Sequence, residues 1–163
     1  MFICRIKGFI FLKLFLSMNK LEIHKLLLSQ LTDNYNQLVE QQLSGNKQND
    51  FKSSAGDKHE TGVAMAHLEQ EKQGNQLRNL EQQIAIVGRL NPALLAEDIR
   101  MGSLVKTSMG WFYISIAFGK LIINHELVFC MGINAPLANV LIGKKKGAII
   151  DWQGSQITII QFS

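Results

Sequence analysis

Two acidic side chains, Asp57 and Glu60, stand three residues apart in the stretch GDKHE near the middle of the chain. Residues with this spacing share one face of a helix, and the positive end of a helix favours acids in its first turn. Carboxylates are also among the oxygen ligands that the hard ion Mg²⁺ accepts, usually one or two of them together with several waters. Plain helix capping is the alternative role, because Asp at a helix start followed by Glu is common.

Other residue types that carry chemistry are scattered. Cys4 and Cys130 are the only cysteines, and neither has a spacing that suits zinc or a disulfide framework. The 4 histidines form no HExxH or similar pair. No Ser/His/Asp or Cys/His constellation is present. We therefore expect that the protein has no cofactor of its own and is not itself an enzyme. We also expect it to lie in the reducing environment of the cytoplasm.

The net charge of +4 is spread unevenly along the 163 residues. Residues 1–17 carry three basic side chains and no acid, residues 18–100 carry nine basic against eleven acidic, and residues 101–163 carry five against two, giving +3, −2 and +3. A surface that binds duplex DNA needs clustered Lys and Arg against the phosphates. The near-neutral balance after residue 17 therefore disfavours direct binding to duplex DNA.

The first 17 residues, MFICRIKGFIFLKLFLS, are apolar but interrupted by Lys7 and Lys13. The stretch is shorter than the ~20 apolar residues that span a bilayer, so we expect no membrane partner. A secretory signal is one interpretation, although no small-x-small cleavage site follows. We favour the other, an upstream extension of the reading frame, because Met18 is followed by Asn19 as a helix N-cap and Glu22 as its reciprocal partner.

Apolar residues recur at seven-residue spacing in two segments, from Asn19 to about Leu43 and from about Lys58 to Arg89. Each segment has two such rows, and the residues of one row lie three or four positions from those of the other. This spacing predicts a helix in each segment, with one apolar seam along it. The predicted seam residues are Leu21, Leu28, Leu31, Tyr35 and Leu38, then Leu77, Leu80, Ile84 and Val87.

Towards the middle of the chain the seam positions become polar, with Gln42, Gln70 and Gln73, so we expect the distal half of the pair to be loosely held. Residues 44–62 are rich in Ser, Gly, Asn, Asp and Lys, which favour turns. The sequence thus predicts an antiparallel helical hairpin over residues 18–90 with its tip near 50–60. Arms of about 30 residues would project roughly 45 Å.

Pro92 ends the second helix, and residues 91–101 are predicted to be a linker. After Gly102 the chain has short runs rich in Ile, Val, Phe, Tyr and Trp. The runs SLVKT, WFYISIAF, KLIIN, ELVFCMGI, AIIDW and QITIIQF predict strands, with turns at 109–110, 124–125 and 153–154. In 135–143, Pro at a first-turn position and a closing Gly predict one short helix. The fold class is therefore α+β: the hairpin, then a small antiparallel sheet domain over 102–163.

Two stretches, in this order, resemble the GreA/GreB family of transcription elongation factors. The first is GDKHE, whose Asp57 and Glu60 fall on the family's two acidic tip positions. The second is NAPLANVLIGKKKG, over 134–147, which resembles the C-terminal signature of the family. The residues that match this signature are Pro136, Leu137, Leu141, Gly143, Lys144, Lys145 and Gly147.

The resemblance implies that the partner is a bacterial RNA polymerase, whose secondary channel the hairpin enters. Asp57 and Glu60 would then assist catalysis of transcript cleavage by helping to hold a Mg²⁺ shared with the polymerase, near the 3′ end of the nascent RNA. Lys58 and His59 are further candidates for contact at the tip. The polymerase itself would be the enzyme, and the C-terminal domain would be FKBP-like.

Pro136, Lys144 and Lys145 are candidates for binding the partner through the C-terminal domain. The three consecutive lysines after the short helix fit either a solvated turn or a docking surface for an acidic partner.

One departure from the family leaves alternatives open. After the acidic tip the family usually has Asn-Ala-Glu/Asp-Tyr, whereas this chain has Thr-Gly-Val-Ala over 61–64. A channel-binding regulator or inhibitor without cleavage activity is therefore the alternative function. A prolyl-isomerase-type enzyme is a weaker one, because the aromatic residues of the sheet domain suit ordinary core packing.

Overall fold

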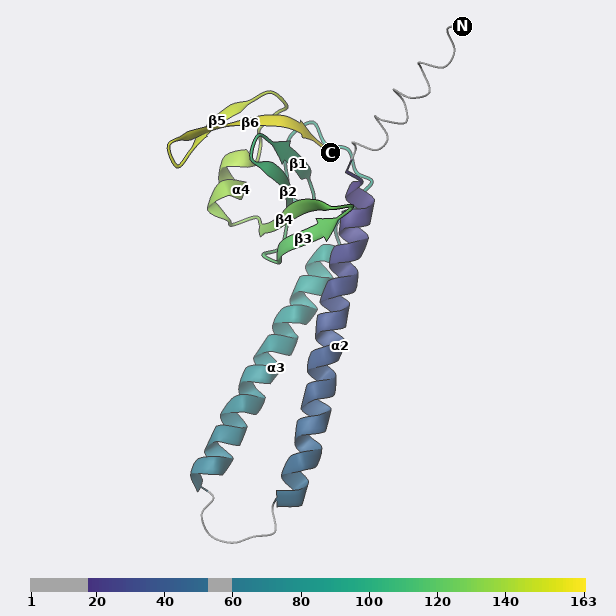
Figure 1. Cartoon of the computed structure of the whole chain (residues 1–163), viewed down its shortest axis with the longest axis vertical. Helices are drawn as coiled ribbons and strands as arrows, with labels where there is room; N and C mark the ends of the chain where they lie inside the picture. The colour runs from purple at the N-terminus through teal and green to yellow at the C-terminus, as the bar shows by residue number, and fades with distance from the viewer. Residues whose placement is uncertain (1–17, 53–59) are drawn as a thin grey trace, which may run out of the picture.

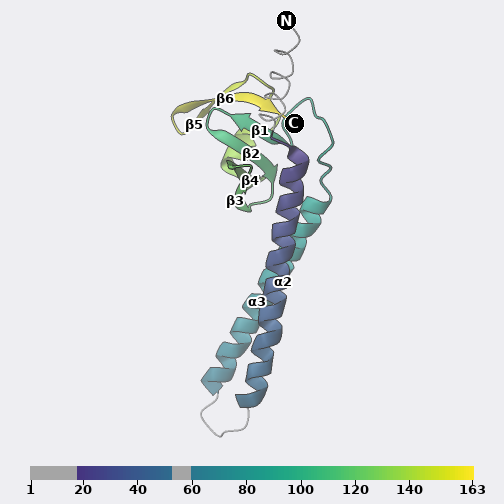
Figure 2. The same cartoon turned by 45° about the vertical axis from the view of Figure 1, so that its right-hand side comes forward.

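The computed structural model describes residues 18–52 and 60–163. Two long helices, α2 (Lys20–Lys52) and α3 (Glu60–Gly88), run antiparallel and form a rod that projects from a small β-rich body (Figures 1 and 2). The 33 residues of α2 correspond to about 50 Å of helix. The end of α2 at Lys52 and the start of α3 at Glu60 both lie at the end of the rod that is remote from the sheet (Figure 1).

The helix α2 is longer than the sequence predicted. It continues through Gly45 to Lys52, where the polar composition indicated a turn, and α3 begins at Glu60. A single glycine inside a helix costs only about 1 kcal/mol, and the neighbouring residues can propagate a helix that is already nucleated. Residues 45–52 and 60–62, which were predicted to belong to the turn, are therefore helical.

An apolar stripe on α2 packs the base of the rod onto the sheet. Ile23, Leu27 and Leu31 are fully buried and belong to a core cluster shared with β-strand residues. Other predicted seam residues near the base also pack there, namely Leu28, Leu80, Ile84 and Val87. Leu21 was predicted to lie in the seam, but its side chain is 43% exposed, so that prediction is wrong. The first turns of α2 pack against the sheet as well as against α3. The buried side chains of these turns are therefore spaced four residues apart, whereas the predicted row had a spacing of seven.

Six strands form one sheet in the order β3-β4-β2-β1-β6-β5. Their bounds are β1 Leu104–Thr107, β2 Gly110–Ser115, β3 Gly119–Ile123, β4 Glu126–Gly132, β5 Ile149–Trp152 and β6 Ser155–Phe162. The helical pair followed by this sheet confirms the α+β class. One detail differs from the prediction, because β2 and β4 pair in parallel while the other pairs are antiparallel. Turn residues specify which strands form a hairpin, but not where that hairpin joins the sheet.

Two of the predicted hairpin turns have backbone geometry that explains their sequences. Asn124 and His125 have φ of 50° and 64°, and Gln153 and Gly154 have φ of 48° and 79°. Two consecutive positive φ angles are the signature of a two-residue turn whose twist matches that of the strands it joins. These turns connect β3 to β4 and β5 to β6.

Strand β2 separates two cores because successive side chains point to opposite faces of a sheet. Trp111 and Tyr113 belong to the core against the rod. Ile114 belongs to the other core, which also contains Ala138 and Leu141 of the short helix α4 (Pro136–Leu141). The rod and α4 therefore cover opposite faces of the sheet.

Two polar contacts start α2, and two others tie its first turns to the rest of the chain. Asn19 caps the helix, since its Oδ1 accepts a hydrogen bond from the Leu21 N–H at 3.0 Å. Glu22 contacts the Asn19 side chain, at 3.5 Å. Lys20 Nζ donates to the Leu94 carbonyl at 3.0 Å, and His24 Nδ1 lies 3.1 Å from the Tyr113 hydroxyl.

Within the part of the chain that the structure describes, no helix is both long and apolar enough to cross a membrane. Among the same residues, no group of three His, Cys, Asp or Glu side chains is arranged to hold a metal ion.

The buried His24 predicts how the stability of the fold depends on pH. Burial and the nearby Lys20 ammonium lower the pKa of His24 from its usual 6.5, because both disfavour the charged ring. The unfolded chain therefore binds a proton more readily than the folded one, and stability that is present above pH 6.5 is lost as the pH falls towards the lowered pKa.

We expect the melting temperature of the protein to drop between pH 7.5 and 5.5, and to drop less in His24→Gln, which has no ring to protonate. Thermal unfolding followed by circular dichroism measures both. The exposed His67 on α3 supplies the matched control, His67→Gln, which should behave like the unchanged protein. Equal pH dependence in all three would contradict this account.

Candidate site at the end of the rod and on the sheet body

The far end of the rod holds the one predicted tip residue whose backbone the structure describes. Glu60 is the first residue of α3, so it lies at the positive end of that helix. Asp57, Lys58 and His59 lie outside the described residues. The separation of the Asp57 and Glu60 carboxylates therefore stays a prediction from their spacing.

The distal part of the rod carries apolar side chains that the hairpin does not bury. Leu43 on α2 and Met65 and Leu68 on α3 are 60%, 68% and 65% exposed. By contrast, Leu27 of α2 and Val87 of α3, near the sheet, are fully buried in the core at the base. The two ends of the rod thus differ, because the base is packed into a core whereas these distal apolar side chains are exposed. That the distal half is loosely held stays a prediction.

The C-terminal motif adopts the conformation that its residue types predict. Pro136 is at the first turn of α4, where its missing N–H costs nothing. Gly143 and Gly147 have φ of 74° and 85°, in the left-handed region that glycine enters without strain. Backbone hydrogen bonds then tie the segment to its neighbours: Ile99 N–H donates to the Lys144 carbonyl at 3.1 Å, and Gly147 N–H donates to the Ile159 carbonyl at 2.8 Å.

This backbone arrangement leaves the basic side chains of the motif at the surface. Lys144 and Lys145 are exposed, as is Pro136. All three belong to the sheet body, whereas Glu60 starts α3 at the other end of the molecule (Figure 1). The predicted site residues that the structure describes therefore lie in two separate places, one at the start of α3 and the others beside α4.

Sequence reasoning missed a groove along the middle of the rod. It has a volume of about 360 Å³ and lies between α2 and α3. The residues that line it are Asn34, Gln37, Leu38, Gln41, Gln76, Asn79, Leu80 and Gln83. We call it the amide groove, because six of these eight residues carry carboxamides. The signal was present in the sequence, since both sets follow the helical spacing i, i+3, i+4, i+7.

Comparison with known proteins adds little to this description. No protein-family model matches the chain, and no curated protein matches it. Among solved structures, the crystal structure of Thermus aquaticus Gfh1 is similar to it at 16% sequence identity and a TM-score of 0.29, covering 82% of this chain and 92% of that one. A TM-score this low assigns neither a shared fold nor a function.

Two glycines give a matched test of the geometry of the C-terminal motif. A Cβ added to either Gly143 or Gly74 would meet no atom within 4 Å, so only backbone conformation separates them. Gly143→Ala places a side chain in the left-handed region and should destabilise the fold by about 1–2 kcal/mol. Gly74→Ala lies inside α3 and should stabilise the fold by up to about 1 kcal/mol.

Urea unfolding of the two variants measures these opposite changes in the free energy of unfolding. If Gly143→Ala proved as harmless as Gly74→Ala, the left-handed turn before the lysines would not be required by the fold.

Proposed function

We propose that this protein is a transcription elongation factor that binds bacterial RNA polymerase and stimulates cleavage of backtracked transcripts. The observation that carries the proposal is the rod: a long helical pair, anchored at one end by the sheet, whose other end begins α3 at Glu60. A narrow arm of this kind can reach a site inside another macromolecule that a compact domain cannot enter. The resemblance of GDKHE and NAPLANVLIGKKKG to the GreA/GreB family indicates that this macromolecule is bacterial RNA polymerase.

The chemistry assigned to the end of the rod needs only acids that arrive at the right place. Asp57 and Glu60 would supply carboxylates to a Mg²⁺ bound by the polymerase, a hard ion that accepts such ligands readily. With two metal ions in place, a polymerase can activate water and stabilise the leaving 3′ oxygen of the RNA. The chain itself would provide no active site, and the polymerase would remain the enzyme.

The sheet body would hold the factor on the outside of the polymerase while the rod reaches inward. Residues 101–163 carry five basic and two acidic side chains, so this part of the chain is suited to an acidic surface. Within it, the exposed Lys144 and Lys145 stand beside α4 on a segment fixed by backbone hydrogen bonds. We assign these lysines and Pro136 to docking.

A second function shares the same architecture. The residues Thr-Gly-Val-Ala at 61–64 replace an acid and an aromatic that the family usually has beside the tip. A protein that occupies the channel without promoting cleavage would compete with other channel-binding factors and inhibit them. The experiment below separates this function from cleavage.

Transcript shortening in stalled elongation complexes tests the proposal directly. We expect the protein to accelerate shortening, and Asp57→Asn or Glu60→Gln to reduce the rate by at least about tenfold, the equivalent of about 1.4 kcal/mol in the barrier. Asp33→Asn and Glu71→Gln remove exposed acids elsewhere on the rod and serve as matched controls that should keep full activity.

The binding of each variant to polymerase, measured separately, distinguishes the outcomes. Lys144→Glu with Lys145→Glu should weaken binding, whereas the tip variants should bind normally. Binding without shortening would support the inhibitor. Absence of binding by the unchanged protein would exclude both functions.

A further inference from the structure

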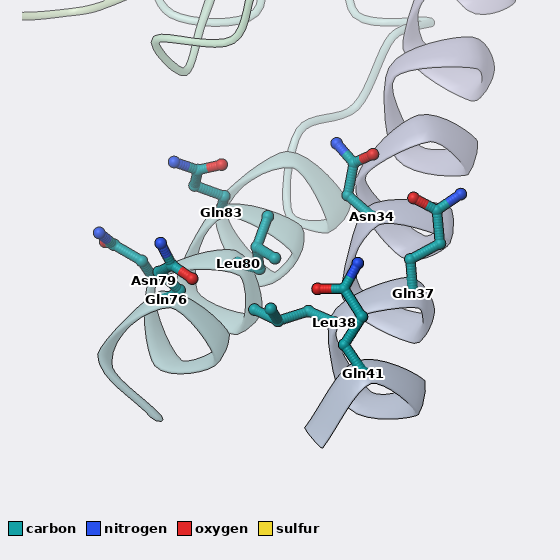
Figure 3. A pocket seen from close by; sticks show the side chains of 8 residues that line it. All are labelled: Asn34, Gln37, Leu38, Gln41, Gln76, Asn79, Leu80 and Gln83. Atoms are coloured by element: carbon teal, nitrogen blue, oxygen red, sulfur yellow. The ribbon is translucent and has the colours of Figure 1, made fainter. Parts of the chain in front are cut away.

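The amide groove is built from matching stripes on the two helices (Figure 3). Leu38 of α2 and Leu80 of α3 point toward one another between the helices. Three carboxamides flank each leucine along its helix, Asn34, Gln37 and Gln41 on α2 and Gln76, Asn79 and Gln83 on α3. The groove therefore has an apolar floor between two walls that can each donate and accept hydrogen bonds.

The carboxamides of these walls face solvent, because five of the six residues are exposed and Gln83 is partly buried. None of the six carboxamides makes a side-chain hydrogen bond to another described residue, whereas neighbouring amides outside the walls do. Gln73 donates to Glu69 at 3.3 Å, and Asn75 accepts from Arg78 at 2.6 Å. The wall amides are thus free to pair with a ligand or with water.

The spacing of the carboxamides suits one kind of ligand. On each helix they stand three and then four residues apart, which at 1.5 Å per residue gives steps of about 4.5 and 6 Å. The main-chain N–H and C=O groups on one side of an extended peptide repeat every two residues, at about 6.6 Å. Flexible carboxamide side chains can close this small difference, so each wall can pair with one edge of an extended chain.

The absence of charged residues from the groove disfavours single-stranded nucleic acid as its ligand. No Lys, Arg, Asp or Glu lines it. Carboxamides also pair with nucleobases, but binding of single-stranded nucleic acid draws its affinity from cations against the phosphates. An uncharged groove with two leucines on its floor favours an uncharged peptide whose small apolar side chains face Leu38 and Leu80.

We propose that the amide groove binds an extended, uncharged peptide segment through its main chain. The Asn and Gln side chains of α2 and α3 pair with the two edges of the segment, and the leucines contact its side chains. This binding does not depend on whether the rod enters a polymerase, so either function can fail without the other.

Nuclear magnetic resonance tests the proposal on the full chain, because Asn and Gln side-chain NH₂ groups give their own ¹⁵N-correlated signals. The probe is a capped pentapeptide of alternating threonine and valine. We expect it to shift the six wall signals saturably, with a Kd of about 1 mM or tighter. A capped alanine-rich helical peptide and pentauridylate RNA, added at the same concentrations, should leave these signals in place.

Paired variants test the assignment of the walls. Gln37→Met with Asn79→Leu keeps the size of both side chains and removes their hydrogen bonds, so affinity for the pentapeptide should fall by about tenfold or more. Gln82→Met alters an exposed amide of α3 outside the groove and should bind normally. Circular dichroism confirms that both proteins remain helical.

Three results would overturn the proposal: no shift of the wall signals with the pentapeptide, equal shifts with the RNA or the helical peptide, or unchanged affinity in the double variant. The transcript-shortening assay is independent of all three.

Discussion

The packing of the first turns of α2 against the sheet is the interaction on which the rest of the molecule depends. A pair of long helices with a polar distal seam gains little from its own contacts, because most helical stability in proteins comes from burying an apolar face. Ile23, Leu27 and Leu31 supply such a face, and all three are fully buried at the base. The distal part of the rod is held in place from that base.

The sheet can anchor the rod and still present the C-terminal motif because one face packs against the rod and the other packs against α4. Alternate residues of β2 enter different cores, with Tyr113 against the rod and Ile114 against α4. The Tyr113 hydroxyl also makes a buried polar contact with His24. Such a contact depends on orientation, whereas apolar packing does not, so it helps to fix the orientation of α2 on the sheet. The direction of the rod and the position of the lysines are therefore set by one sheet.

Much of this architecture follows from local sequence signals. The two-residue turns at 124–125 and 153–154, the proline at the start of α4 and the glycine after it each satisfy a backbone requirement that few residue types meet. The α+β class and most strand positions follow from the same signals. At the far end, the sequence predicted a second helix from about Lys58, and among the described residues α3 spans Glu60–Gly88.

Features that depend on contacts distant in sequence could not be predicted in the same way. The parallel pairing of β2 with β4 is one, because it depends on where a hairpin inserts. The exposure of Leu21 is another such feature. It arises because packing against the sheet buries a row of α2 side chains that differs from the predicted seven-residue rows. The amide groove was missed because polar residues at helical spacing also describe a solvated face, and only the facing helix makes them a groove.

The central claim is that packing at the base fixes the direction of the rod, and a distance measurement between spin labels tests it most directly. Labels at Met65→Cys on the rod and Ile149→Cys on the sheet body occupy exposed positions, with Cys4→Ser and Cys130→Ala removing the native thiols. We predict one long, narrow distance distribution that Leu21→Ala preserves and Leu27→Ala broadens. A broad distribution in the parent protein, or equal widths in both variants, would contradict the account.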